Sequence, residues 1–156
     1  SVKPAQATLV PDAPGQLTSD HGWDVAANED LLSDVLERLR DSSIRSSLFI
    51  DPSVAAIEQV PAVKADRVEL YTEEYAASFG TSQEGEVFNR YFMAATRATE
   101  LGIGLNAGHD LDLVNLPRFL KIPNILEVSI GHALVVESLQ YGMSCVIEKY
   151  LAITRV

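Results

Sequence analysis

The apolar residues of this chain fall into two alternating patterns, short continuous runs and longer segments with helical spacing. Five runs of five or six residues have the length and composition of buried strands: 5–10, 46–50, 67–72, 103–107 and 125–130. The segments between and after them predict helices, which we expect after Asn28, at 52–60, 73–79, 86–100, 111–120 and 133–141, and after Gly142. Alternating strands and helices are typical of a parallel α/β fold, and we expect a single domain over residues 1–156.

Several residues are suited to the ends of these elements. Asn28 is a good N-cap for the first helix, and Asp51 with Pro52 is expected to cap and start the second. Gly108 is expected to break the fourth strand and to free the backbone for a turn. Cys145 lies in a helical, mostly apolar stretch, where we expect it to be a small buried side chain.

Two of the predicted strands are followed by the same dipeptide, Gly-His. Gly108 and His109 follow the fourth strand, and Gly131 and His132 follow the fifth. Since the carboxyl ends of parallel strands form the rim where ligands bind, we expect both imidazoles on one rim. Histidine exchanges protons near neutral pH, so the pair is a candidate for acid–base chemistry, with a structural role for each histidine as the alternative.

Two further polar features have more than one interpretation. Glu69 lies in the middle of the third strand, where it faces either a barrel lumen or a salt bridge to the packed helices. Thr18 lies at the polar tip of a loop rich in glycine and proline. A solvated surface loop is the simplest interpretation of that segment, and a place in the site is the alternative.

Charge and composition exclude some classes of function. The formal net charge of −10 argues against a general affinity for nucleic acids or anionic membranes. It leaves room for a small anionic substrate, because backbone N–H groups at a helix start bind phosphate locally. The single cysteine indicates a reducing compartment, and we expect a cytoplasmic protein without a membrane span.

The last two strands each end in a glycine-bearing loop, and the final loop leads into an extra short helix. This matches the phosphate site that TIM (β/α)₈ barrels build after strands seven and eight. If the match holds, the five strands correspond to strands four to eight of such a barrel. We therefore expect this chain to be the C-terminal portion of a barrel whose first three strands it does not contain.

The chain resembles the pyridoxine 5′-phosphate synthase family of (β/α)₈ barrels over nearly its whole length. The residues that carry the resemblance are Leu9-Val10-Pro11 with Thr18-Ser19, 47–51, 68–72 with Tyr75-Ala76, 106–111 and 127–133. It implies the condensation of 1-deoxy-D-xylulose 5-phosphate with 3-amino-2-oxopropyl phosphate to pyridoxine 5′-phosphate, phosphate and water. This is a transferase reaction without metal or organic cofactor, and by resemblance the enzyme is a homo-oligomer, an octamer.

The resemblance also implies roles for individual residues. His109 matches the proton donor, and Glu69 matches the carboxylate that stabilises the transition state. Thr18 matches a contact to the xylulose substrate. The contacts to the aminoketone phosphate match Asp110, Gly131 and His132.

Asp110 and Glu73 stand at positions that are often glycine in the family. A carboxylate beside a phosphate repels it, so at Asp110 the contact is expected from the backbone or with the carboxylate turned away. At Glu73 the resemblance therefore predicts no particular conformation for the loop.

The motifs that the family carries on its first three strands, among them a further catalytic histidine and glutamate, have no counterpart here. We therefore expect this chain alone to lack synthase activity. Two other functions remain as alternatives, another phosphate-binding barrel enzyme of the isomerase or aldolase type, and a non-catalytic half-barrel assembly module. An aldolase would need a lysine at a strand end for a Schiff base, and no lysine occupies such a position in the sequence.

Overall fold

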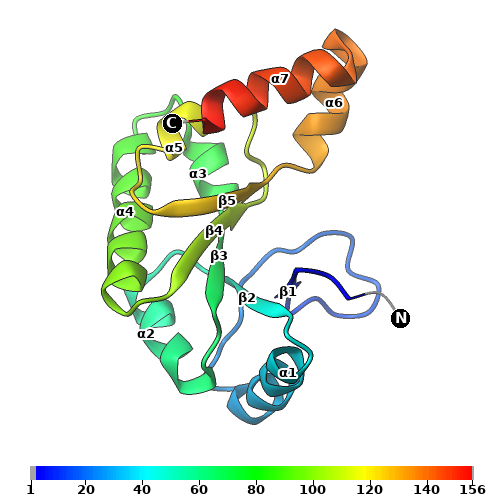
Figure 1. The fold of residues 1–156 in the computed structure, drawn as a ribbon. Helices are drawn as coiled ribbons and strands as arrows, with labels where there is room; N and C mark the ends of the chain where they lie inside the picture. Colours follow the sequence, from blue (N-terminus) through cyan, green and yellow to red (C-terminus); the bar gives the residue numbers. More distant parts are fainter. Residues whose placement is uncertain (1–2, 156) are drawn as a thin grey trace.

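The computed structural model describes residues 3–155, which form a five-stranded parallel sheet (Figure 1). The strands are paired in chain order: β1 (Gln6–Leu9), β2 (Arg45–Ile50), β3 (Arg67–Tyr71), β4 (Gly104–Gly108) and β5 (Ile125–Ser129). All five lie where the apolar pattern predicts them, which confirms the parallel α/β fold. The order has no reversal of the kind that marks doubly wound sheets, and it is consistent with part of a TIM barrel.

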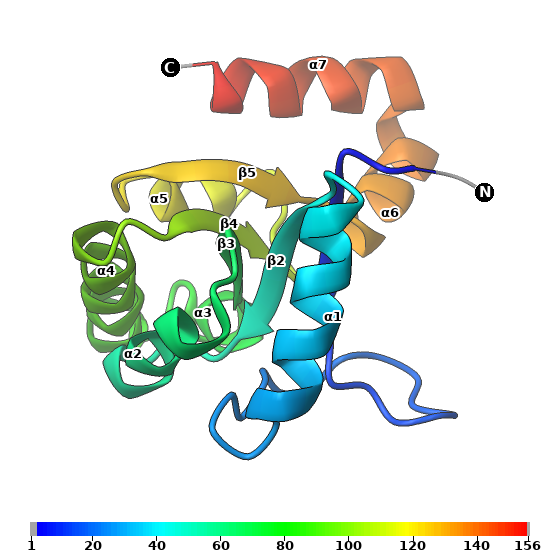
Figure 2. The same ribbon diagram turned by 60° about the horizontal axis from the view of Figure 1, so that its bottom comes forward.

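Helices connect the strands and continue the chain beyond β5. They are α1 (Glu29–Asp41), α2 (Val54–Val63), α3 (Glu73–Ser78), α4 (Glu84–Glu100), α5 (Leu116–Phe119), α6 (His132–Tyr141) and α7 (Met143–Thr154). Figures 1 and 2 show α2 and α4 along one side of the sheet and α6 leading away from the end of β5. Helix α7 turns back, so that Thr154 at its end lies beside β5. Within residues 3–155, none of the helices is both long enough and apolar enough to cross a membrane.

The register of the strands separates an apolar face from a polar one. On the helix side, β2 to β4 place fully or almost fully buried residues: Leu48, Ile50, Val68, Leu70, Leu105 and Ala107. These residues form the core together with apolar residues of the helices, among them Leu36, Ile57, Val60, Tyr91 and Ala95. The alternate positions of the same strands point to the other side, which we call the helix-free face.

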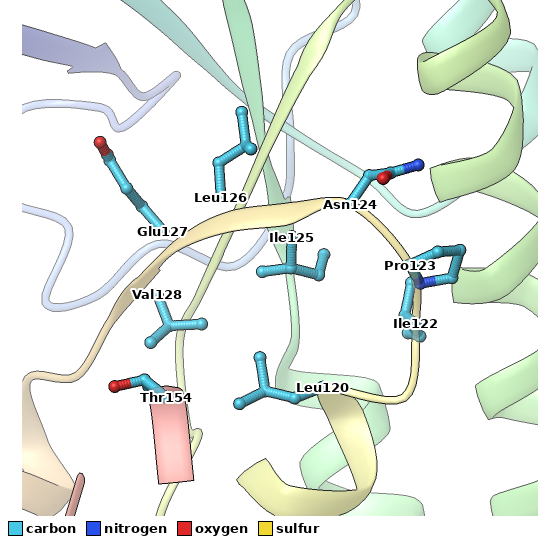
Figure 3. A pocket seen from close by; sticks show the side chains of 9 residues that line it. All are labelled: Leu120, Ile122, Pro123, Asn124, Ile125, Leu126, Glu127, Val128 and Thr154. Atoms are coloured by element: carbon cyan, nitrogen blue, oxygen red, sulfur yellow. The ribbon is translucent and has the colours of Figure 1, made fainter. Parts of the chain in front are cut away.

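A β-bulge shifts the register of β5 at Leu126. Ile125 pairs with Leu105 and Glu127 pairs with the next residue, Asn106, so that Leu126 is the extra residue. Figure 3 shows the consequence, with Leu126 and Glu127 on one side of the strand and Ile125 and Val128 on the other. The bulge therefore places the carboxylate of Glu127 on the helix-free face.

Two of the predicted helix caps are wrong in detail. Ser53 caps α2, since its Oγ accepts a hydrogen bond of 3.1 Å from the N–H of Ala56. Asp51 instead accepts a 2.8 Å bond from the N–H of Gly22. Asn28 does precede α1, but its side chain makes no cap and donates to the carbonyl of Asp24. A long-range or a preceding partner has outcompeted the local cap in both cases.

The expectation that Cys145 is buried is also wrong, because its side chain is exposed on α7. The buried residues of that helix are Val146 and Tyr150. A short apolar helix has too little polar contrast for its sequence to show which side packs against the core.

The loop 10–28 is anchored to the end of β2 by close backbone packing. Trp23 donates its N–H to the carbonyl of Phe49 at 2.9 Å, and its Nε1 donates to the carbonyl of Leu9 at 2.9 Å. A Cβ added at Gly22 would lie 2.3 to 2.6 Å from backbone atoms of Ile50 and Asp51. The loop can follow this path only because position 22 has no side chain.

We therefore predict that Gly22→Ala lowers the free energy of unfolding by about 1–3 kcal/mol, the usual cost of forcing extra atoms into a packed site. Gly85→Ala is the matched control, because its added Cβ meets nothing within 4 Å and lies in α4. That control should be neutral or stabilising, since alanine favours helix. Urea unfolding of both variants measures the difference, and equal midpoints would contradict the prediction.

Candidate active site

The turn after β4 has an unusual backbone. His109 and Asp110 have φ angles of 93° and 56°, both in the left-handed region. Residues other than glycine pay about 1–3 kcal/mol each for such conformations, which persist when surrounding contacts impose them. Gly108 itself has no positive φ, so the expected freedom of its backbone is not what makes the turn.

Side chains of Thr72 and Asn115 hold this turn by its carbonyl groups. The buried hydroxyl of Thr72 donates to the carbonyl of Gly108 at 2.9 Å and contacts the carbonyl of His109. Asn115, also buried, donates from Nδ2 to the carbonyl of Asp110 at 3.0 Å. The sequence alone did not indicate these two residues, although a threonine directly after a strand lies at the rim where such contacts are made.

Three of the predicted site residues meet at His109. Its Nδ1 lies 2.8 Å from Oδ2 of Asp110, and its Nε2 lies 2.9 Å from Oγ1 of Thr18. The ring of Tyr71 stands edge-on to the imidazole, with 5.0 Å between the ring centroids. Thr18 is exposed, as the surface-loop interpretation predicts, and it contacts His109, as a place in the site predicts.

Glu69 lies on the helix-free face, as the lumen interpretation expected. Its carboxylate is 9% exposed and accepts a 3.1 Å bond from Oγ1 of Thr8. Burial raises the pKa of the Glu69 carboxyl, hydrogen bonds from Thr8 and Ser129 oppose the rise, and the charge of Glu127 adds to it. No lysine or arginine among residues 3–155 forms a salt bridge with it, so the helix-packing interpretation is wrong.

Glu69 also explains the glycine that precedes the catalytic candidate. A Cβ at Gly108 would lie 2.4 Å from Oε1 of Glu69 and 2.9 Å from Cβ of Ser129. The absent side chain leaves room for the carboxylate directly beside the turn that carries His109. The carboxylate of Glu69, from the middle of β3, therefore lies against the residue that precedes His109 at the carboxyl end of β4.

The second Gly-His pair lies on the same rim without touching the first. Gly131 precedes α6, and the exposed His132 is the first residue of that helix. The first N–H groups of a helix have no partner within it, so they point outward at this end of β5. Among the described residues, no hydrogen bond or ring contact joins His132 to His109.

A polar network covers the amino-terminal half of the helix-free face, with Glu127 at its centre. Its carboxylate pairs with Arg45 and Arg67 at 2.8 and 2.9 Å. It also accepts hydrogen bonds from Gln6 at 2.9 Å and from Asn106 at 3.3 Å. The sequence analysis assigned Glu127 no role, although it is a carboxylate inside a strand, as Glu69 is.

The rim around His109 carries negative charge. The pKa of the Tyr71 hydroxyl is raised by burial and further by the carboxylates of Glu73, Asp110, Asp20 and Asp51. A cavity of about 300 Å³ beside Tyr71 is lined by three of these groups and their neighbours: Asp51, Pro52, Tyr71, Glu73, Glu74, Arg90 and Tyr91. Among the described residues, no group of three or more acidic, histidine or cysteine side chains has a geometry that could hold a metal ion.

A cavity of about 670 Å³ lies elsewhere, along β5 and away from His109. Figure 3 shows it between the strand, the loop 120–124 and Thr154 at the end of α7, on the side of β5 to which Ile125 and Val128 point. Its walls are polar and apolar in similar measure, and the carboxylate of Glu127 points away from it, to the other side of β5 (Figure 3). The position of this cavity therefore indicates packing rather than chemistry.

Comparison with known proteins adds independent information. A family model described as "Pyridoxal phosphate biosynthesis protein PdxJ" matches residues 1–156. The pyridoxine 5′-phosphate synthase of Cytophaga hutchinsonii is 47% identical over 152 residues, which are 97% of this chain and 63% of that protein. The protein of the same name from Bacteroides thetaiotaomicron is 49% identical over 150 residues, 96% of this chain and 63% of that protein.

A third relative, the pyridoxine 5′-phosphate synthase of Brucella anthropi, is 45% identical over 152 residues, 96% of this chain and 62% of that protein. This chain therefore spans a little under two thirds of the length of the curated relatives that it matches. The match runs through every strand and through both Gly-His turns. This chain therefore belongs to the PdxJ family of pyridoxal phosphate biosynthesis proteins.

Proposed function

We propose that the protein to which this chain belongs is a pyridoxine 5′-phosphate synthase, a transferase. It condenses 1-deoxy-D-xylulose 5-phosphate with 3-amino-2-oxopropyl phosphate and releases phosphate and water. The observation that carries the proposal is the 45–49% identity, over nearly all of this chain, to relatives that bear this name. Both substrates are phosphorylated small molecules, and the proposal includes no metal and no organic cofactor.

We also propose that the five strands are strands four to eight of a (β/α)₈ barrel. Five of eight strands is close to the 63% of the relatives' length that the chain covers. The sequential order of the strands and the polar helix-free face both support this assignment. The cavity along β5 fits as well, because a further strand and its helix would pack in that place.

His109 is the proposed proton donor of the dehydration. Its Nε2 faces the hydroxyl of Thr18 at 2.9 Å, so an oxygen atom fits at hydrogen-bonding distance from that nitrogen. Imine formation, dehydration and ring closure all move protons, and a histidine at the rim suits such steps near neutral pH. In the acid step, Nε2 gives its proton to the departing hydroxyl, which leaves as water.

Glu69 is the proposed stabiliser of positive charge in the transition state. Its carboxylate is buried beside the His109 turn, where an unpaired charge acts more strongly than in water. We further propose that Thr18 contacts the xylulose substrate. The aminoketone phosphate is bound by the backbone at Asp110 and by the N–H groups at Gly131 and His132.

The side chain of Asp110 supports this division of roles. Its carboxylate is turned to Nδ1 of His109 and not into the rim, which reduces its repulsion of a phosphate. The lysines do not offer an alternative Schiff-base chemistry at the rim, because Lys3 precedes β1, Lys64 follows α2, Lys121 follows α5 and Lys149 lies in α7.

We propose a cytoplasmic homo-oligomer. Exposed apolar side chains on α6 and α7 support coverage by further protein, and they include Val135, Leu139, Met143, Ile147 and Leu151. The exposed thiol of Cys145 fits a reducing compartment.

The decisive experiment compares two proteins in the same assay for pyridoxine 5′-phosphate. We expect the purified 156-residue chain to be inactive, because it carries no counterpart of the strand-one to strand-three motifs. Joined to the part of the Cytophaga hutchinsonii synthase that it does not match, it should form product from both substrates. Product from the chain alone would overturn the first expectation, and a folded but inactive fusion would overturn the proposed function.

In the active fusion, His109→Asn should reduce kcat by about 10² to 10⁴, the usual contribution of general acid catalysis, while KM for both substrates changes little. His21→Asn is the matched control, because His21 lies in the loop 10–28, which also carries Thr18, but contacts Asp20 and not His109. A raised KM at nearly normal kcat would assign His109 to phosphate binding and would contradict the acid role.

Glu69→Gln should reduce kcat by about 10², because it removes a preorganised charge and keeps the shape of the side chain. The pKa of Glu69 is higher in the folded protein than in the unfolded chain. At pH values above about 4.5 the folded state therefore binds more protons than the unfolded state does. The stability that Glu69 contributes is thus complete at low pH and is lost as the pH rises through the raised pKa. Glu69→Gln should therefore unfold less readily than the parent at neutral pH, with a smaller difference near pH 4.

Glu127→Gln is the control for this effect, since its carboxylate pairs with Arg45 and Arg67. Removing that charge should lower stability at neutral pH, opposite in sign to Glu69→Gln. Urea unfolding at both pH values measures both variants. A loss of stability in Glu69→Gln at neutral pH would show that the Glu69 carboxylate is stabilising as a charge.

A further inference from the structure

Both nitrogens of His109 have a partner, and the two partners differ in chemistry. The carboxylate of Asp110, 2.8 Å from Nδ1, can only accept a hydrogen bond. The hydroxyl of Thr18, 2.9 Å from Nε2, can either donate or accept. Because the carboxylate needs a donor, Nδ1 carries a proton in this arrangement. Nε2 is then the nitrogen that can hold or release one.

The contact between His109 and Asp110 depends on the backbone of the turn. Neighbouring residues usually direct their side chains apart, but both residues here have a positive φ. Aspartate tolerates the left-handed conformation better than most residues. The carbonyls that flank the pair are held by the buried side chains of Thr72 and Asn115. The turn is thus held in a conformation in which the carboxylate reaches the preceding imidazole.

The chain contains a second pair of adjacent aspartate and histidine residues, whose contact is not enclosed by buried side chains. Asp20 and His21 also interact, but their side chains are 68% and 54% exposed on the loop 10–28. The side chains of His109 and Asp110 are 22% and 40% exposed, and the imidazole packs edge-on against Tyr71. The pair at the carboxyl end of β4 is therefore less solvated than the other.

We propose that Asp110 is a positioning residue that holds His109 in its Nδ1–H form and so assigns proton exchange with the substrate to Nε2. The proposal deepens the proposed function, on which its kinetic part rests. In the acid step the N–H bond at Nε2 breaks, its electron pair stays on nitrogen, and the proton passes to the substrate oxygen. The imidazole that remains is neutral, and its other proton stays on Nδ1 beside Asp110. A glycine at position 110 cannot hold the ring in this way.

Nitrogen NMR of the imidazoles tests the tautomer in this chain without any reaction. The chain has three histidines, so His21→Gln and His132→Gln assign the signals. Under conditions at which the rings are neutral, we expect the Nδ1–H pattern for His109. Asp110→Gly, which also suits the positive φ, should shift the pattern toward the Nε2–H form. Asp20→Gly is the matched control and should leave the His109 pattern unchanged.

The second readout is kinetic and uses the fusion described above. Asp110→Gly should lower kcat by about 10- to 100-fold with little change in KM, since a mispositioned acid slows the chemical step and not binding. Asp110→Asn keeps the shape and an acceptor oxygen, and it should recover part of the loss.

The outcomes separate this proposal from the proposed function. A His109 signal in the Nε2–H form, or one that Asp110→Gly leaves unchanged, overturns the positioning role whatever the enzyme does. If Asp110→Gly shifts the tautomer of His109 but the folded fusion forms no product, the positioning role is upheld and the proposed function is overturned. If the glycine variant does not fold, Asp110→Ala, which also removes the acceptor, carries the same two measurements, and a normal kcat together with an unchanged tautomer overturns the proposal.

Discussion

The carboxylate of Glu127 joins one side chain from each of the other four strands. Gln6 comes from β1, Arg45 from β2, Arg67 from β3 and Asn106 from β4. Without a shared anion, the two arginines on this face would repel each other. Their repulsion would oppose the pairing of the strands that carry them. The bulge at Leu126 brings that anion to the correct side. The polar contacts of the helix-free face depend on the Glu127 carboxylate. The position of the rim at the carboxyl ends of the same strands depends on it in turn.

Two carboxylates on the helix-free face have opposite surroundings. Glu127 is partly exposed and paired with cations, whereas Glu69 is buried and bonded only to neutral hydroxyls. Both residues lie at the same level of the sheet, since each pairs with Asn106. The side chain of Glu127 reaches arginines at the amino ends of β2 and β3. The side chain of Glu69 reaches toward Gly108 at the carboxyl end of β4, where the contrasting environment suits its proposed role.

The strands and the rim could be read from the sequence because both depend on local pattern. Apolar runs locate β2 to β4 to within one or two residues, and the residues that follow a strand must lie at the rim. Such local patterns do not predict contacts between residues that are far apart in the sequence. Asp51 bonds to Gly22 and not to its own helix, and Thr72 holds a turn that lies 36 or 37 residues later in the chain. The bulge at Leu126 likewise has no signature in β5 itself, because it is defined only against β4.

The contact between position 108 and Glu69 links the histories of two sites that are far apart in the chain. Any side chain at position 108 would occupy the space of the Glu69 carboxylate. A larger residue 108 would force that carboxylate to move or residue 69 to shorten, and Cβ of Ser129 restricts the same space. Under the proposed role of Glu69, selection for its carboxylate therefore also selects for glycine at position 108.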